Sequence, residues 1–167
     1  MITLASQADI PELMRIFNQG TAYFKALGID QWQGSYPEFT VLEQDITAKQ
    51  CYVKKEEGMI VGTIVVSLLE ETCYGGLKAG AWRYDEPYTV IHRLAINREH
   101  PTKGVSYELL AWAERVTKLA NRQVIRVDTH ADNKGMQHIL TKVGYELVGE
   151  VMLDDGGQRV VLDKKVK

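Results

Sequence analysis

The sequence predicts a mixed α/β or α+β fold, and three features indicate it. Residues 88–96 form an apolar run typical of a strand, and a polar loop then leads into an amphipathic helix over residues 105–120. Other short apolar runs alternate with segments whose apolar residues recur every three or four positions. Near the end of the chain, residues 145–153 and 159–166 enclose a D-D-G-G segment, which predicts an antiparallel hairpin. This order of elements favours helices packed on a mixed sheet.

Composition limits the class of protein. The chain has 167 residues, of which 45% are apolar, so we expect one domain over residues 1–167 with a buried core. A formal net charge of −2 without a long basic run argues against a nucleic-acid partner. No apolar stretch approaches the roughly 20 residues that cross a bilayer, and the N-terminus lacks the pattern of a signal peptide. We therefore expect a cytoplasmic protein with no membrane partner.

The first third of the chain predicts a short strand and two helices. Residues 2–5 form the strand, and the first helix ends at Gly28, because glycine commonly stops a helix. Thr40 and Glu43 have the T-x-x-E spacing of a capping box. This box predicts that the second helix begins at Thr40 and continues to about residue 49.

The loop between these helices, residues 29–37, carries Trp32 and Tyr36 among polar residues. Two interpretations are open. The aromatic rings either fill the edge of the core or line a substrate pocket, where amphipathic aromatic side chains suit a partly wet wall.

The middle of the chain predicts two strands, at residues 51–55 and 59–67, joined by a turn. Residues 70–87 hold three glycines and a proline, and they predict a long loop or a β excursion. The helix over residues 105–120 has one apolar face, which we expect to pack on a sheet. This face consists of Val105, Leu109, Trp112, Val116 and Leu119.

A strand over residues 124–129, a polar turn and a short helix over residues 133–143 follow, and Gly144 ends the helix. The earlier strand–loop–helix segment, with its glycine-bearing loop over residues 97–106, has two interpretations. It is either an ordinary connection or an anion site, since the first turn of a helix presents backbone N–H groups and a positive dipole end.

Two segments resemble the GNAT (GCN5-related N-acetyltransferase) superfamily. They are HRLAINREHPTKGVSYELLAWAE (92–114) and VDTHADNKGMQHILTKVGY (127–145). The resemblance implies a mostly antiparallel central sheet flanked by helices, with a splayed strand pair around the cofactor. It also implies a transferase, an acyltransferase that moves the acetyl group of acetyl-CoA to an amine of a small molecule or a protein. Late strands in this family often pair between subunits, so a homodimer is an expectation from the resemblance.

The resemblance assigns cofactor contacts to three places. The exposed backbone of one splayed strand would bind the pantetheine arm as an added strand would; one N–H there would polarise the thioester carbonyl. The glycine-bearing loop would hold the pyrophosphate. Asn133 would contact the cofactor arm, although an N-cap is its other interpretation. The residues concerned are Leu94, Ala95, Ile96, Thr102, Lys103, Gly104, Val105, Ser106 and Asn133.

The catalytic assignment is less complete. His92 lies in an H-x-L-A-I run that resembles the arylalkylamine N-acetyltransferase branch, where a histidine at this place serves proton removal. The other interpretation is a histidine packed at a strand end. The tyrosine that commonly serves as general acid is replaced by Leu140, and Pro101 and Ser106 depart from the loop pattern. Neither the histidines nor Cys51 and Cys73 have the spacing of a metal site.

Two alternatives to an acetyltransferase remain open in the sequence. One is a non-catalytic acyl-CoA-binding or regulatory module on the same fold, which the missing tyrosine and the altered loop suggest. The other is a structural or partner-binding domain without a cofactor.

Overall fold

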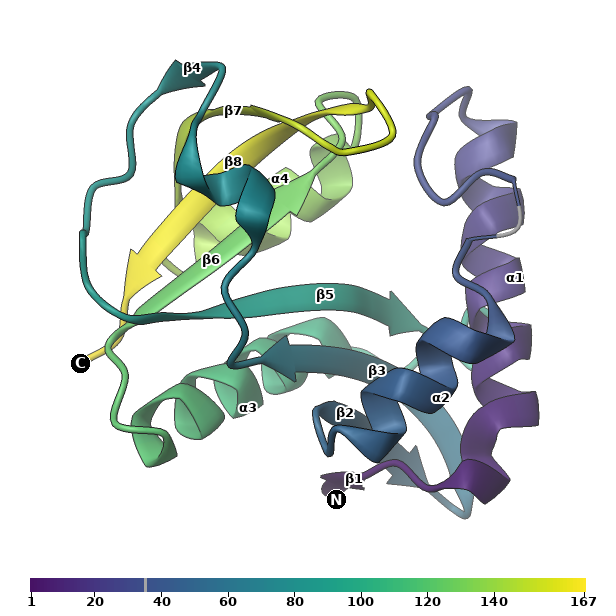
Figure 1. The fold of residues 1–167 in the computed structure, drawn as a ribbon. Coiled ribbons are helices and arrows are strands. Elements are labelled where there is room, and N and C mark those ends of the chain that lie inside the picture. Colours follow the sequence, from purple (N-terminus) through teal and green to yellow (C-terminus); the bar gives the residue numbers. More distant parts are fainter. Residues whose placement is uncertain (35) are drawn as a thin grey trace. The chain divides into compact units, whose positions relative to one another are not determined.

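The computed structural model describes residues 1–34 and 36–167, which fold into two compact units. The first unit contains Met1–Val66 and His92–Trp112, and the second contains Ser67–Ile91 and Ala113–Lys167. Strand β5 (Tyr88–Ile96) and helix α3 (Val105–Leu119) each contribute residues to both units (Figure 1). Most strand pairs are antiparallel and helices flank them, which confirms the predicted fold class.

The first unit is built from three antiparallel strands and two helices, in addition to parts of β5 and α3. Its own elements are β1 (Ile2–Leu4), α1 (Ile10–Ala26), α2 (Phe39–Thr47), β2 (Cys51–Glu56) and β3 (Met59–Ser67). The predicted strands at residues 51–55 and 59–67 are confirmed.

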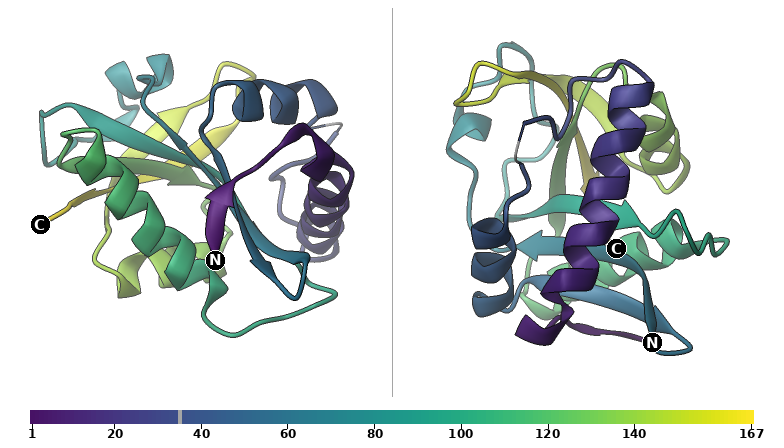
Figure 2. Two further views of the ribbon diagram at one scale, coloured as in Figure 1. Left: turned by 90° about the horizontal axis from the view of Figure 1, so that it is seen from below. Right: turned by 90° about the vertical axis from the view of Figure 1, so that its right-hand side faces the viewer.

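Alternating side chains of β2 explain why helices cover both faces of these strands. Cys51 and Val53 belong to the core that α1 and α2 form with the sheet. The neighbouring side chains point the other way, toward α3: the Tyr52 ring lies 5.8 Å from that of Trp112, and Lys54 pairs with Glu108. Because successive side chains of a strand point to opposite faces, β2 contributes to the packing on both faces of the sheet. Figure 2 shows α3 on the opposite side of β2 and β3 from α1 and α2.

The predicted end of α1 at Gly28 is confirmed. Gly28 has a φ of 71°, the N–H of Ile29 donates to the Phe24 carbonyl at 2.9 Å, and the N–H of Gly28 donates to the Lys25 carbonyl at 3.1 Å. This is the Schellman pattern, in which glycine takes the left-handed conformation that other residues avoid.

The predicted start of α2 at Thr40 is wrong. The helix begins at Phe39 with Glu38 as its N-cap, and the N–H groups of Val41 and Leu42 donate to the Glu38 carbonyl at 3.1 and 3.2 Å. Thr40 is therefore a residue of the first turn, not the cap. The backbone carbonyl that accepts the first helical bonds defines the cap, whereas the T-x-x-E spacing only indicates one.

The second unit contains a strongly paired set of strands. Its elements are η2 (a 3₁₀ turn, Thr72–Gly75), β4 (Ala79–Gly80), β6 (Val124–Thr129), α4 (Lys134–Lys142), β7 (Glu146–Met152) and β8 (Gln158–Lys165). Strand β8 pairs antiparallel with both β6 and β7, and β7 pairs with β4. Helix α4 and the η2 turn lie on opposite sides of these strands (Figures 1 and 2). Residues 70–87 thus hold both a loop and a small β excursion.

The parallel pairing of β5 with β6 covers the first part of β5. It runs from Tyr88 opposite Val124 to Ile91 opposite Val127. Residues 92–96 of β5 follow the last pair. A strand that continues past its pairing is what the expected splayed arrangement requires.

The buried face of α3 differs from the predicted one at its end. Leu119 is 75% exposed, whereas Ala113 and Thr117 are buried. The Thr117 hydroxyl hydrogen-bonds that of Thr89 at 2.7 Å and donates to the Ala113 carbonyl at 2.7 Å. Because two residues turn a helix by about 200° at 3.6 residues per turn, a stripe through Thr117 leaves Leu119 on the opposite side.

Candidate active site

The junction of β5 and α3 presents an open helix N-terminus. Gly104 has a φ of 81°, and its carbonyl accepts the first helical bond, from the Glu108 N–H at 3.0 Å. A Cβ placed on Gly104 would meet no heavy atom of the described residues within 4 Å, apart from its chain neighbours. A glycine cap brings no side-chain acceptor to the N–H groups of the first turn. These donors and the positive end of the helix dipole suit an anion.

Asn97 holds the loop that leads to this helix. The residue is 2% exposed; its N–H donates to the Val61 carbonyl at 2.9 Å and its Nδ2 to the Ile60 carbonyl at 3.0 Å. Its Oδ1 accepts from the Glu99 N–H at 3.1 Å. One side chain therefore fastens the start of the loop to β3 and also shapes it. Sequence reasoning missed Asn97, although a polar residue directly after an apolar strand was a visible signal.

Helix α1 also holds the loop. The Gln19 amide accepts from the Arg98 N–H at 2.7 Å and donates to Oδ1 of Asn97 at 3.4 Å. The Arg98 guanidinium lies 3.5 Å from the centre of the Tyr23 ring, a cation–π contact. The loop is thus anchored from two elements of the first unit.

The residues assigned to the pyrophosphate loop differ in exposure. Lys103 and Gly104 are exposed, and Thr102 and Ser106 are half-buried. Val105 is 2% exposed because its side chain packs closely on Gly62. A Cβ placed on Gly62 would lie only 2.5 Å from Cγ1 of Val105. Only the backbone of Val105 is therefore suited to an external anion.

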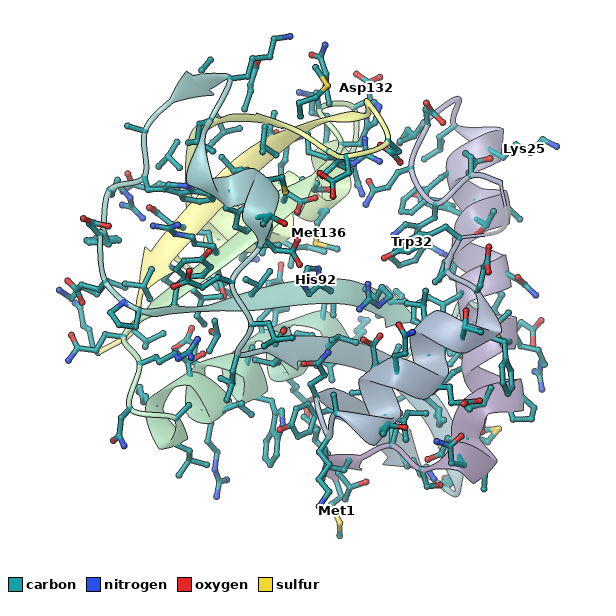
Figure 3. All side chains as sticks on the ribbon, in the orientation of Figure 1. Met1, Lys25, Trp32, His92, Asp132 and Met136 are labelled. Carbon is teal, nitrogen blue, oxygen red and sulfur yellow. The ribbon has the colours of Figure 1, made fainter. Side chains whose placement is uncertain are left out.

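The assigned strand residues lie on the part of β5 beyond its pairing with β6. Leu94 is buried, Ile96 is half-buried, and Ala95 packs against the core of the first unit. His92 precedes them on the same strand and is half-buried (Figure 3). A half-buried imidazole keeps part of its surface accessible, which a base needs.

Arg93, next to His92, makes a buried ion pair that sequence reasoning missed. Its Nε and one terminal nitrogen donate to the two oxygens of Asp45, both at 2.8 Å, and its other terminal nitrogen donates to the Tyr36 hydroxyl. Burial lowers the pKa of Arg93, but the Tyr36 and Asp45 oxygens outweigh burial and raise it overall. The guanidinium therefore stays charged. No local spacing signals a pair formed over 48 residues.

The two aromatic residues assigned to the substrate differ. Trp32 packs on α1: its ring is edge-on to Phe17 at 5.4 Å and to Phe24 at 5.5 Å, and a Cβ on Gly20 would lie 3.0 Å from it. This supports the interpretation of Trp32 as a core-edge residue. Tyr36 is 41% exposed and tied to Arg93, so its ring has surface available for a ligand.

Asn133, in the second unit, is the N-cap of α4. Its Oδ1 accepts from the Met136 N–H at 3.2 Å, and the residue is buried. The N-cap interpretation is confirmed. The Oδ1 acceptor is used inside the helix, while a contact with a cofactor stays a prediction.

The position where the resemblance expects a general acid, Leu140, lies in the core. Leu140 is fully buried, and burial raises the pKa of the neighbouring buried Tyr145 far above its ordinary range. Burial also raises the thiol pKa of Cys51 and of Cys73 to about 11. Both thiols are therefore protonated near neutral pH, which makes them poor nucleophiles.

Metal clusters and membrane-spanning helices are both absent from the described residues. Among residues 1–34 and 36–167, no three or more His, Cys, Asp and Glu side chains gather in a way that would hold a metal ion. In the same part of the chain, no helix has both the length and the apolar character to cross a bilayer.

A strand that continues past its pairing with a parallel neighbour, followed by a glycine-capped helix, is the arrangement that the resemblance to acetyltransferases led us to expect. The family can be stated more closely. Residues 15–145 match the model of the acetyltransferase (GNAT) family, so this chain belongs to that family. It is an N-acetyltransferase, and no finding supports the non-catalytic alternative.

Known proteins resemble the chain over nearly its whole length. A GNAT-family acetyltransferase of Streptococcus agalactiae 2603 is 30% identical, with a TM-score of 0.89 over 100% of this chain and 95% of that one. The S-(2-succino)cysteine N-acetyltransferase of Bacillus subtilis (strain 168) is 22% identical over 98% of this chain and 94% of that protein. A putative acetyltransferase of Salmonella typhimurium, solved with acetyl-CoA, is 14% identical (TM-score 0.72; 100% and 94% covered) and shows the fold alone.

Proposed function

We propose that the chain, acting as one domain over residues 1–167, transfers the acetyl group of acetyl-CoA to the amine of a small molecule. The glycine-capped N-terminus of α3, which follows β5 after the loop over residues 97–104, carries this proposal. Such a terminus offers several N–H donors and a positive dipole end to a pyrophosphate. Membership of the GNAT family and the Salmonella relative solved with acetyl-CoA support the same ligand.

The residues after β5 would hold the diphosphate. The backbone of Thr102, Gly104 and Val105 supplies donors, the Ser106 hydroxyl adds a contact, and the exposed Lys103 adds charge attraction. The backbone of residues 94–96 would pair with the pantetheine arm as a neighbouring strand would. Bound acetyl-CoA would supply an acetyl thioester, whose carbonyl an N–H of this segment would polarise.

His92 would act as the base. The imidazole takes a proton from the ammonium form of the acceptor, directly or through a water, which leaves a nucleophilic amine. The amine nitrogen then bonds to the carbonyl carbon while the carbon–sulfur bond breaks, and the nitrogen gives up its second proton to water. The sulfur leaves as a thiolate and takes its proton from water, because Leu140 stands where a tyrosine would supply one.

The acceptor is proposed to be a small amine of the amino-acid type. The relative that is similar over 98% of this chain is named S-(2-succino)cysteine N-acetyltransferase, and S-(2-succino)cysteine is an amino acid. Tyr36, exposed at the loop between α1 and α2, would contact the acceptor. An amino-acid panel with detection of released CoA thiol is therefore the first activity screen.

The test of this proposal compares two histidine variants. His92→Gln is expected to lower kcat by at least about 100-fold, the scale of general-base catalysis, and to leave the acetyl-CoA Kd within about twofold by calorimetry. His138→Gln, at an exposed position of α4, is the control and should keep wild-type turnover. Equal loss of turnover and affinity in His92→Gln would make His92 a structural residue. No acetyl-CoA binding by the wild-type protein would reject the proposed function itself.

A further inference from the structure

Arg93 has an unusual backbone conformation at a critical place. It lies in the middle of β5, yet its φ is 50°, in the left-handed region that residues with a Cβ avoid. Such a conformation persists only where the surroundings enforce it, and it is enriched at functional sites. Arg93 stands between His92 and Leu94, the proposed base and the first residue of the proposed pantetheine edge.

The side chain of Arg93 belongs to a buried ion pair. The Arg93 and Asp45 side chains are 10% and 5% exposed, and two hydrogen bonds of 2.8 Å join them. A planar guanidinium that grips both carboxylate oxygens fixes its orientation as well as its position. Asp45 lies on α2 and also accepts from the Gln50 amide at 3.3 Å, so the carboxylate is itself held.

The backbone dihedrals of Arg93 determine how the chain on either side is directed. Side chains and N–H groups alternate regularly only along an extended strand. One left-handed residue changes that alternation between His92 and Leu94. The ion pair thus acts on the two groups that the proposed reaction uses, although Arg93 itself faces α2.

We propose that Arg93, clamped by Asp45, is a positioning residue that holds β5 in the conformation aligning the His92 imidazole and the Leu94 N–H for acetyl transfer. The Tyr36 hydroxyl accepts a hydrogen bond from the same guanidinium. This bond connects the loop between α1 and α2, which carries the proposed contact with the acceptor amine, to the Arg93–Asp45 pair. The inference rests on the proposed function and adds to it the residues that set its geometry.

A matched pair of double variants tests the backbone role. Asp45→Asn/Arg93→Gly and Asp45→Asn/Arg93→Ala both lack the guanidinium and the buried carboxylate charge. They differ in one methyl group, and only glycine adopts a φ of 50° without strain. We expect kcat of the glycine variant to exceed that of the alanine variant by about tenfold, with acetyl-CoA KM equal within about twofold.

The opposite order would overturn the proposal. In an extended strand, glycine is the less favourable residue, so a purely structural Arg93 predicts an alanine variant at least as active as the glycine variant. Both enzymes are assayed well below their unfolding temperatures, so that kcat reports the folded state. If the wild-type enzyme is active and the two double variants have the same kcat, the positioning role of Arg93 is rejected but the proposed function is not. If the wild-type protein has no activity, the proposed function is rejected.

Lys49 offers a control for the effect of backbone strain on stability. It has a φ of 56°, is exposed, and lies between α2 and β2 in the same unit. Lys49→Gly should melt at a higher temperature than Lys49→Ala, while the two share one kcat. If kcat differs between Lys49→Gly and Lys49→Ala as much as between the two Arg93 variants, backbone strain anywhere in the unit affects turnover. The specific role proposed for Arg93 would then be rejected.

Tyr36→Phe isolates the loop contact. The substitution removes only the hydroxyl that accepts from Arg93 and leaves the Asp45 pair in place. We expect the KM of the amine to rise about threefold to tenfold, the scale of one typical intramolecular hydrogen bond, with the acetyl-CoA KM unchanged. An unchanged amine KM would show that the hydrogen bond between Tyr36 and Arg93 does not help to bind the acceptor.

Discussion

The β5–α3 and β6–α4 connections each run from a strand through a polar loop to a helix, and they end differently. In the first unit, β5 leads to α3, whose first helical bond is accepted by the carbonyl of Gly104. In the second unit, β6 leads to α4, whose cap is the side chain of Asn133, bonded to the Met136 N–H at 3.2 Å. Glycine leaves first-turn donors for another acceptor, whereas asparagine uses one of them.

The two loops are also held in different ways. The first is fastened from outside, by Asn97 to β3 and by Gln19 of α1 to the Arg98 N–H. In the second, a side chain of the following helix contacts the loop, since the Gln137 amide donates to the Ala131 carbonyl at 2.9 Å. A loop fixed from outside keeps its shape without filling its own donors. The comparison therefore points to the first connection as the main anion site, and three substitutions test it, ordered by expected loss of acetyl-CoA affinity.

Gly104→Val should have the largest effect. Valine at a φ of 81° is strained, and its branches would fill the space beside the helix N-terminus. We expect the acetyl-CoA Kd to rise by more than about tenfold in calorimetry. Gly28→Val is the matched control, since Gly28 has a φ of 71° and equally open space at the end of α1. Loss of acetyl-CoA affinity in both variants would indicate general destabilisation of the protein instead of loss of the anion site at the N-terminus of α3.

Asn97→Ala should have an intermediate effect. The change leaves the buried Ile60 carbonyl without this donor and releases the start of the loop. We expect unfolding free energy to fall by about 2 kcal/mol, and the acetyl-CoA Kd to rise by roughly fivefold because the loop must be ordered on binding. Thermal unfolding and calorimetry measure the two effects. A destabilised protein with wild-type affinity would show that Asn97 supports β3 only.

Asn133→Ala should change affinity least. Removing an N-cap costs about 1 kcal/mol of stability, and we expect the acetyl-CoA Kd to stay within about twofold. Asn133→Ser, which retains a capping oxygen, should recover most of the melting temperature. A tenfold loss of affinity without a change in melting temperature would instead assign Asn133 a direct contact with the ligand, and the contrast between the two connections would disappear.

Sequence reasoning located the elements of both connections well. It predicted β5 and β6 with the observed bounds, and it placed the start of α3 at Val105. It misplaced the start of α2, where a capping-box spacing at Thr40 competed with the actual cap at Glu38. Spacing alone does not say which carbonyl accepts the first helical bond, so helix starts are less certain than strand interiors.

The sequence by itself determined the local features of this protein. Apolar periodicity sets the strands and helices, glycine at 28 and 104 sets left-handed turns, and Asn133 sets a cap, because each depends on residues within a few positions. The tertiary structure alone decided the long-range contacts. Arg93 meets Asp45 over 48 residues and Asn97 meets Ile60 over 37. Such pairs depend on which elements pack together, and no local pattern encodes that choice.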